Sequence, residues 1–190
     1  MDNLWLKAEP GSDGVCRYVV RFQANDNDQL SYQYSPIGNL EERQSQVSGT
    51  TRYTYDGLNR VITVTYDEQQ ITVTYDDLGR VDTYQRGNLT TSYTYDGNNR
   101  ITRVSHGSII DGRTERLDVF TYNYDAVGNL IKVERLANGG TTEVSYSYDI
   151  DQRLISERWL SSEGETFYAV SYRYDDAGNR IEENRNGRVT

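Results

Sequence analysis

Residues 53–81 read YTYDGLNRVITVTYDEQQITVTYDDLGRV and contain two copies of one short pattern. In each copy an aspartate, Asp56 or Asp76, follows a tyrosine at the end of a run of strand-forming residues. Three residues later comes Asn59 or Gly79, and asparagine and glycine both tolerate a positive φ. An aspartate at the start of a turn accepts hydrogen bonds from the backbone N–H groups of that turn. The pattern therefore predicts a strand, a tight turn and a second strand, which is a β-hairpin.

The same pattern recurs along most of the chain, and internal repeats define the architecture of such proteins. The aspartate position is occupied by Ser35, Asp56, Asp76, Asp96, Asp125, Asp149 and Asp175. The positions three residues later are Gly38, Asn59, Gly79, Asn99, Gly128, Gln152 and Gly178. The tyrosines before the aspartates are Tyr53, Tyr55, Tyr75, Tyr93, Tyr95, Tyr122, Tyr124, Tyr146, Tyr148, Tyr172 and Tyr174. We expect about seven hairpins, in which these tyrosines, the six aspartates and the turn glycines have a structural role.

A shorter duplication predicts how two neighbouring strands pair, because ITVTYD occurs twice in the quoted stretch. A turn that spans residues 67–70 would place Tyr66 opposite Ile71. The same turn would place Val64 opposite Val73. Side chains alternate between the two faces of a strand, so both tyrosines of a motif are expected on one face.

The remaining segments also fit strands and loops. Residues 40–46 have the best helix propensity, but they occupy a second-strand position of the repeat, and we expect a strand there. Residues 1–15 are expected to form an irregular N-terminal segment, and residues 16–190 the hairpin array, with its last unit truncated. Residues 105–118 and 136–142 are expected to be longer loops.

The repeat number and the composition together predict the fold class. About fourteen strands at ~4.8 Å spacing would make a sheet roughly 65 Å wide, and open sheets of that width curl. We therefore predict an all-β fold in which repeated antiparallel β-hairpins form a curved, strip-like sheet. Leu, Ile, Val and Phe make up only about a fifth of the chain, against 17 Tyr, which excludes a thick aliphatic core. Stacking of tyrosine rings between hairpins is expected to replace that core, and bridges between turns are expected from Arg60, Arg80, Arg100 and Arg153.

Several classes of function are disfavoured by the composition. A net charge of -9 argues against a nucleic-acid partner. The single cysteine, Cys16, and the single histidine, His106, which we place in a loop, support neither a disulfide, a zinc site nor a catalytic triad. Residues 26–28 are acidic but lack the spacing of a calcium-binding EF-hand loop, and the repeated aspartates fit turn capping better than catalysis. We expect no enzyme activity, no catalytic residue, no metal and no cofactor, and we find neither a membrane-spanning run nor a signal peptide.

Three copies of the motif carry a resemblance to a known family. They are Tyr55-Asp56-x-x-Asn59-Arg60, Tyr75-Asp76-x-x-Gly79-Arg80 and Tyr124-Asp125-x-x-Gly128-Asn129-Leu130. These sequences resemble the YD repeats of the Rhs family, which includes bacterial Rhs polymorphic toxins, the C component of insecticidal Tc toxins and animal teneurins. The resemblance covers about residues 30–185.

This resemblance implies a non-enzymatic structural module: a segment of a β-shell that encapsulates a toxin domain and helps to deliver it. It implies a bacterial origin and a secreted or extracellular location. The implied partners are the rest of a longer YD-repeat shell, or a second copy through open strand edges, and an enclosed toxin domain. The chain is too short to close a shell, lacks the Asp-Pro motif of the family's self-cleaving region, and ends where we expect the last hairpin still to be running. The alternative is a stand-alone adhesion or carbohydrate-binding module with exposed aromatic side chains.

Overall fold

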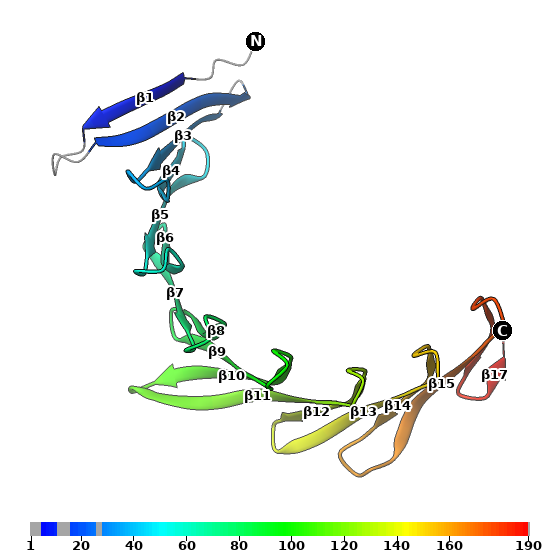
Figure 1. Cartoon of the computed structure of the whole chain (residues 1–190). Coiled ribbons are helices and arrows are strands. Elements are labelled where there is room, and N and C mark those ends of the chain that lie inside the picture. The colour runs from blue at the N-terminus through cyan, green and yellow to red at the C-terminus, as the bar shows by residue number, and fades with distance from the viewer. Residues whose placement is uncertain (1–4, 11–15, 26–27, 190) are drawn as a thin grey trace. The chain divides into compact units, whose positions relative to one another are not determined.

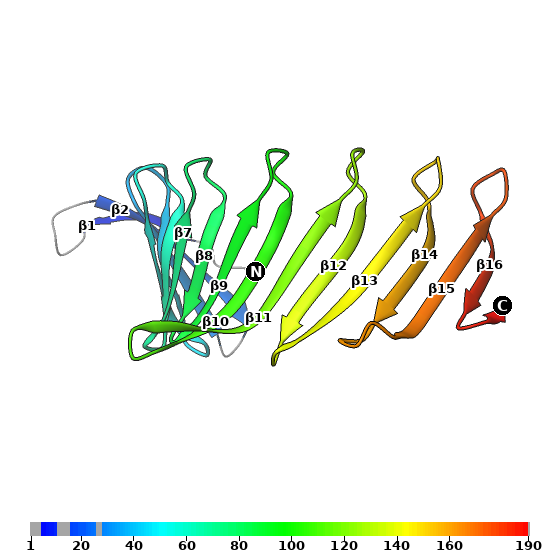
Figure 2. The ribbon, with the colours of Figure 1, turned by 90° about the horizontal axis from the view of Figure 1, so that it is seen from below.

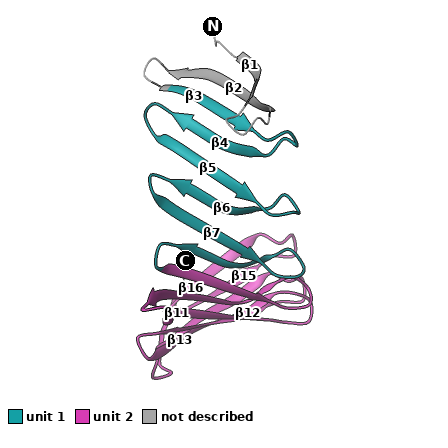
Figure 3. Ribbon diagram, turned by 90° about the vertical axis from the view of Figure 1, so that its left-hand side faces the viewer, with its two compact units in different colours: residues 1–88 teal, residues 89–190 magenta. Residues whose placement is uncertain are grey.

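The computed structural model describes residues 5–10, 16–25 and 28–189, with side chains from Gln29 to Arg188. The chain forms two compact units, Met1–Asn88 and Leu89–Thr190 (Figure 3). The first unit contains β1 (Trp5–Pro10), β2 (Cys16–Asn25), β3 (Asp28–Tyr34), β4 (Leu40–Ser45), β5 (Gly49–Tyr55), β6 (Val61–Tyr66), β7 (Gln69–Tyr75) and β8 (Val81–Arg86). The second contains β9 (Leu89–Tyr95), β10 (Ile101–Ile110), β11 (Arg113–Tyr124), β12 (Leu130–Ala137), β13 (Gly140–Tyr148), β14 (Leu154–Leu160), β15 (Thr166–Tyr174), β16 (Arg180–Arg185) and β17 (Arg188–Val189).

Each unit is an antiparallel strip in which every strand pairs with the next one along the chain. The described residues contain no helix, so the predicted all-β fold is confirmed. The strip of the second unit curves gradually from β10 to β17 (Figure 1). Its YD turns, by which we mean the turns that begin at the aspartate position, lie along one edge (Figure 2). All seven predicted hairpins are present, from β3–β4 to β15–β16.

The two faces of each strip differ in chemistry, because side chains alternate along a strand. In the first unit Tyr53 lies opposite Val64, and Val64 lies opposite Ile71. One residue along, on the other face, Thr54 lies opposite Thr63. We call these the tyrosine face and the hydroxyl face. The second unit repeats the pattern: a tyrosine-face row runs through Val133, Val144 and Trp159, and a hydroxyl-face row through Ser147, Ser156 and Ser171.

Little apolar surface is fully buried in a strip this thin. Among the described residues the buried apolar side chains are Leu30, Val104, Val119 and Val170. No large side chain in the described part is completely buried. The predicted lack of a thick aliphatic core is therefore confirmed, and the contacts that join neighbouring hairpins have to be found elsewhere.

Two local strand predictions have clear outcomes. The strand expected at residues 40–46 is confirmed as β4. The irregular start expected for residues 1–15 is wrong for Trp5–Pro10, which forms β1 and pairs with β2, while residues 1–4 and 11–15 lie outside the described part. Pro10 ends β1, where a residue without an N–H is tolerated.

The loops expected at 105–118 and 136–142 are wrong. These residues extend two hairpins, and tight turns at Asp111–Gly112 and Asn138–Gly139 close them. All four turn residues have positive φ, which the two-residue type I′ turn requires and which Asp-Gly and Asn-Gly sequences favour. The longer repeat spacing in this part of the chain therefore comes from longer strands.

The predicted pairing of β6 with β7 is shifted by two residues. Val64 lies opposite Ile71, and Tyr66 lies opposite Gln69. The turn holds only Asp67 and Glu68, with φ of 43° and 65°. A shift of two keeps every side chain on its predicted face. At the C-terminal end, the expectation of a truncated last hairpin is also wrong, since β15 and β16 form both of its strands.

Candidate functional site: the clamp between neighbouring YD turns

The YD turn has the same backbone geometry in all seven copies. In the second copy the N–H of Asp56 donates to the C=O of Arg60 at 2.9 Å, and the N–H of Asn59 donates to the C=O of Asp56 at 3.0 Å. This is a three-residue hairpin loop that ends in a residue of left-handed conformation. That residue has a positive φ in every copy: Gly38, Asn59, Gly79, Asn99, Gly128, Gln152 and Gly178.

The aspartate side chain holds the turn together from inside. Oδ1 of Asp56 accepts hydrogen bonds from the N–H groups of Leu58 and Arg60, both at 2.9 Å, and Oδ2 accepts one from Nε of Arg60 at 2.8 Å. The same arginine contact recurs at Asp76, Asp96 and Asp149. In the other two aspartate turns an asparagine Nδ2 replaces the guanidinium, with Asn129 on Asp125 and Asn179 on Asp175, each at 3.0 Å.

These contacts lower the pKa of all six turn aspartates below the ordinary value of 3.8. For Asp56 the largest cause of the lowered pKa is the hydrogen bond from the backbone N–H of Arg60, followed by the bond from the Arg60 side chain. Both bonds favour the charged carboxylate over the neutral acid.

Acid is therefore expected to weaken the fold through these turns. A carboxyl whose pKa is lower in the folded chain stabilises the fold above its unfolded pKa, and this contribution is lost as the pH falls through the folded pKa. We expect the melting temperature, followed by circular dichroism, to be nearly constant from about pH 7 to about pH 5 and to fall below about pH 4. Asp56→Asn should reduce the acid-dependent part of the loss. A melting temperature independent of pH down to about pH 3 would contradict this role of the aspartates.

Successive hairpins are joined by an arginine and a tyrosine. The guanidinium carbon of Arg60 lies 4.3 Å from the ring centre of Tyr75, the last residue of the next hairpin's first strand. The hydroxyl of Tyr75 donates to the C=O of Val61, the residue after that arginine, at 2.7 Å. We call this set, Asp56, Arg60, Val61 and Tyr75, the clamp.

The clamp recurs along the described chain. Arg100 lies over Tyr124, whose hydroxyl bonds Ile101, and Arg153 lies over Tyr174, whose hydroxyl bonds Leu154. Where asparagine replaces arginine the tyrosine bond persists, from Tyr55 to Leu40 at 2.7 Å and from Tyr148 to Leu130 at 2.9 Å. Burial raises the pKa of Tyr55 and Tyr148.

The expected stacking of one tyrosine ring on another is wrong for the clamp tyrosines. The ring partner of Tyr75, Tyr124 and Tyr174 is a guanidinium group. Equivalent tyrosines of successive hairpins are two strands apart, about 10 Å, and ring contacts need centres within roughly 7 Å. An arginine at the turn is long enough to fill this gap. The bridging role expected for Arg60, Arg100 and Arg153 is thus confirmed.

The first tyrosine of each motif lies mid-strand on the tyrosine face. Each faces a residue of its own hairpin: Tyr53 with Val64, Tyr93 with Val104, Tyr122 with Val133, Tyr146 with Glu157, and Tyr172 with Glu183. Burial raises the pKa of Tyr122 and Tyr146. Tyr95 ends β9 and pairs with Ile101 across its own hairpin.

Two features were missed or misplaced by the sequence analysis. The turn between β14 and β15 repeats the YD hydrogen bonds, with Ser161 in the aspartate position and Gly164 at a φ of 81°. Its Ser-x-x-Gly spacing could have revealed it. His106, expected in a loop, lies in β10, where Nδ1 is 2.9 Å from Oγ1 of Thr91 and the ring makes a T-shaped contact with the ring of Phe120.

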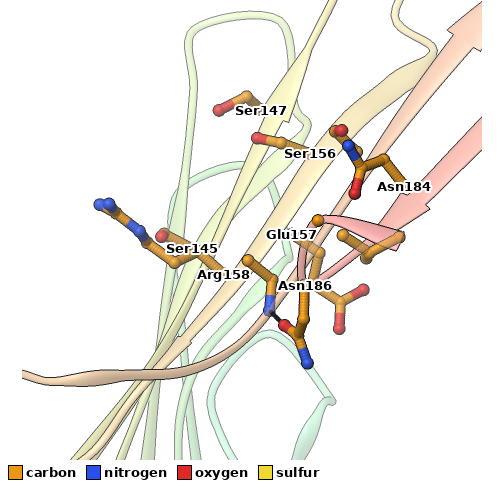
Figure 4. Close-up of a pocket in the computed structure, with 11 residues that line it drawn as sticks. Ser145, Ser147, Ser156, Glu157, Arg158, Asn184 and Asn186 are labelled. Carbon is orange, nitrogen blue, oxygen red and sulfur yellow. Dashed lines mark hydrogen bonds between the residues drawn. The ribbon is translucent and has the colours of Figure 1, made fainter. Parts of the chain in front are cut away.

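Both faces of the second unit are shallowly hollowed. A cavity of about 410 Å³ on the tyrosine face is lined by Phe120, Val144, Trp159 and Phe167 among others. A cavity of about 400 Å³ on the hydroxyl face is lined largely by serines and asparagines (Figure 4). Among the described residues no group of three or more His, Cys, Asp or Glu side chains could hold a metal ion. That part of the chain also contains no helix long and apolar enough to cross a membrane.

The fold and the clamp define a class of protein: an antiparallel β-hairpin repeat whose hairpins are joined turn to turn. Residues 21–114 match the family model described as Teneurin YD-shell. This match covers residues in the first part of the chain, and it agrees with the resemblance of the motifs to the YD repeats of the Rhs family.

Two solved structures have a similar fold, and one toxin is similar in sequence over a short segment. The crystal structure described as TcdB2-TccC3-TEV matches 95% of this chain and 11% of its own, with a TM-score of 0.66 and 19% identity. A second, TcdB2-TccC3-Cdc42, matches 92% of this chain and 11% of its own, with a TM-score of 0.66 and 20% identity. The Double-stranded DNA deaminase toxin A of Burkholderia cenocepacia (strain H111) is 44% identical over 55 residues, which are 27% of this chain and 4% of that protein. The chain therefore spans a small fraction of the length of each of these proteins.

Proposed function

We propose that this chain forms part of the wall of a YD-repeat shell that encloses a toxin domain, and that it has no catalytic role of its own. The observation that carries the proposal is the clamp, which joins hairpins in the same way in both units. A contact that links each hairpin only to its neighbours suits an extended wall, because such a wall grows by repetition without a central core. In this proposal the repeated tyrosines, aspartates and turn glycines act structurally.

The similarity to structures that contain TccC3, and to a protein named as a toxin, supports the assignment of the cargo as a toxin domain. The same similarity supports a secreted bacterial protein. The partners would be further YD repeats on either side of the strip, together with the enclosed domain.

A graft into a related shell tests this function. Residues 30–185 of this chain would replace the structurally matching segment of the TccC3-containing protein. We expect the chimaeric particle to keep its size in gel filtration and its enclosed domain to resist trypsin as in the parent. A matched graft that carries Tyr75→Ala should make the enclosed domain more sensitive to trypsin. A chimaera of the parent size whose enclosed domain is digested like the free domain would contradict the proposal.

The adhesion or carbohydrate-binding alternative makes a different prediction for the isolated chain. Its natural site would be the aromatic cavity on the tyrosine face, where Trp159 and Phe167 are exposed. Binding on a glycan array that is lost in Trp159→Ala would favour this alternative over the shell wall.

A further inference from the structure

The arginine of one clamp also contacts the next turn of the strip. A Cβ added to Gly79 would lie 3.1 Å from a terminal guanidinium nitrogen of Arg60. That guanidinium cannot easily give way, because Asp56 and Tyr75 hold it from two sides. The pattern is repeated where Gly128 faces Arg100 at 3.6 Å and Gly178 faces Arg153 at 3.8 Å. At these two positions a Cβ alone would fit, but a longer side chain would extend toward the arginine.

Where a YD turn ends in asparagine instead of arginine, the left-handed residue of the next YD turn has an amide side chain. Asn39 precedes Asn59, and Nδ2 of Asn39 donates to Oδ1 of Asn59 at 3.1 Å. Asn129 precedes Gln152, which holds a φ of 62° despite being neither glycine nor asparagine. A side chain therefore occupies the left-handed position in both copies that follow an asparagine turn.

Five of the six successive pairs follow this rule: Asn39 with Asn59, Arg60 with Gly79, Arg100 with Gly128, Asn129 with Gln152, and Arg153 with Gly178. The sixth pair, Arg80 and Asn99, is an exception, because an arginine turn is followed there by a left-handed residue with an amide side chain; its two members belong to different compact units.

We propose that the last residue of one YD turn and the left-handed residue of the next form a matched interface that makes some pairs of neighbouring hairpins more stable than others. The preferred partner of an arginine turn is a YD hairpin with glycine at its left-handed position. The partner of an asparagine turn is a YD hairpin with an amide side chain there. This inference concerns the strip itself and does not depend on whether a toxin is enclosed.

A double-mutant cycle on the full chain tests the matched interface. The variants are Gly79→Asn, Arg60→Asn and the double variant, which recreates the arrangement of Asn39 and Asn59. The control is Gly38→Asn, because Gly38 occupies the same turn position at a φ of 90° with nothing within 4 Å of an added Cβ. The control measures the effect of the backbone conformation alone.

We expect Gly79→Asn to lower the melting temperature by roughly 3–6 °C more than Gly38→Asn does. When Arg60 is already replaced by asparagine, Gly79→Asn should lower the melting temperature no more than Gly38→Asn does. Equal effects of Gly79→Asn in both backgrounds would overturn the proposal.

A second readout covers variants that melt without a single sharp transition. Amide hydrogen exchange at Asp76 and Gly79 reports opening of this turn directly. Exchange should accelerate in Gly79→Asn and return toward the Arg60→Asn value in the double variant. A milder pair of variants, Gly79→Ala and Gly38→Ala, adds only the Cβ. Amide exchange in the altered turn should accelerate more in Gly79→Ala than in Gly38→Ala. Exchange that is equally fast in Gly79→Asn and in the double variant would likewise overturn the matched interface.

Discussion

Replacing Gly79 by valine is expected to destabilise the first unit strongly, by roughly 2–3 kcal/mol. Gly79 has a φ of 82°, a conformation that a β-branched side chain adopts only under strain. The new side chain would also meet the guanidinium of Arg60, from which a Cβ would be only 3.1 Å away. Urea unfolding followed by circular dichroism should show a clearly lower midpoint.

The matched comparison is Asn59→Gly, at the same position of the preceding turn. Glycine adopts the φ of 62° without strain, so this variant loses only the exposed hydrogen bond from Asn39. We expect a loss of less than about 1 kcal/mol. If both variants lowered the midpoint equally, the left-handed turn and the contact with Arg60 could not be what makes Gly79 necessary.

The YD turn can be predicted from the sequence because its chemistry is local. An aspartate that caps the turn and a residue that tolerates positive φ three places later are both visible in the letters. The same locality explains why seven hairpins can be counted from the sequence alone. The Asp-Gly and Asn-Gly turns at residues 111–112 and 138–139 carry an equally local signal, but the longer spacing there suggests a loop when it is read without the strands around it.

The register of β6 with β7 could not be derived in the same way. A two-residue turn at Asp67 and Glu68 places both at positive φ, which aspartate tolerates but glutamate seldom adopts. Local propensity argues against such a turn, so the pairing of Val64 with Ile71 must be favoured by the strands on either side. The sequence pattern specified which face each side chain takes, and it left the two-residue shift along the strand open.

The clamp was only half predictable. The sequence showed that arginine follows many of the turns and that tyrosine precedes them, but the contact joins residues of different hairpins, such as Arg60 and Tyr75. Which of the possible partners meets a tyrosine ring depends on the distance between alternate strands. That distance favours the long arginine side chain over a second ring.

The tyrosine of the clamp gives the second large expected effect. Tyr75→Ala removes the ring beneath Arg60 and the hydroxyl that donates to the C=O of Val61. Because the ring is half-buried rather than in a closed core, we expect a loss of about 2–3 kcal/mol, somewhat below the range for fully buried aromatic residues. Urea unfolding of the variant and of the parent chain, both over the full sequence, measures this loss.

Two further variants separate the contributions of ring and hydroxyl. Tyr75→Phe keeps the ring and should lose only about 1 kcal/mol, the net value of one hydrogen bond. Tyr84→Ala, in the middle of β8 with an exposed ring, should lose less than Tyr75→Ala, although it removes the same atoms. Since a hairpin repeat without a thick core depends on contacts between neighbours, the loss at Tyr75 should also broaden the unfolding transition as the hairpins on either side uncouple. Equal losses at Tyr75 and Tyr84 would mean that the joint between successive turns contributes nothing of its own.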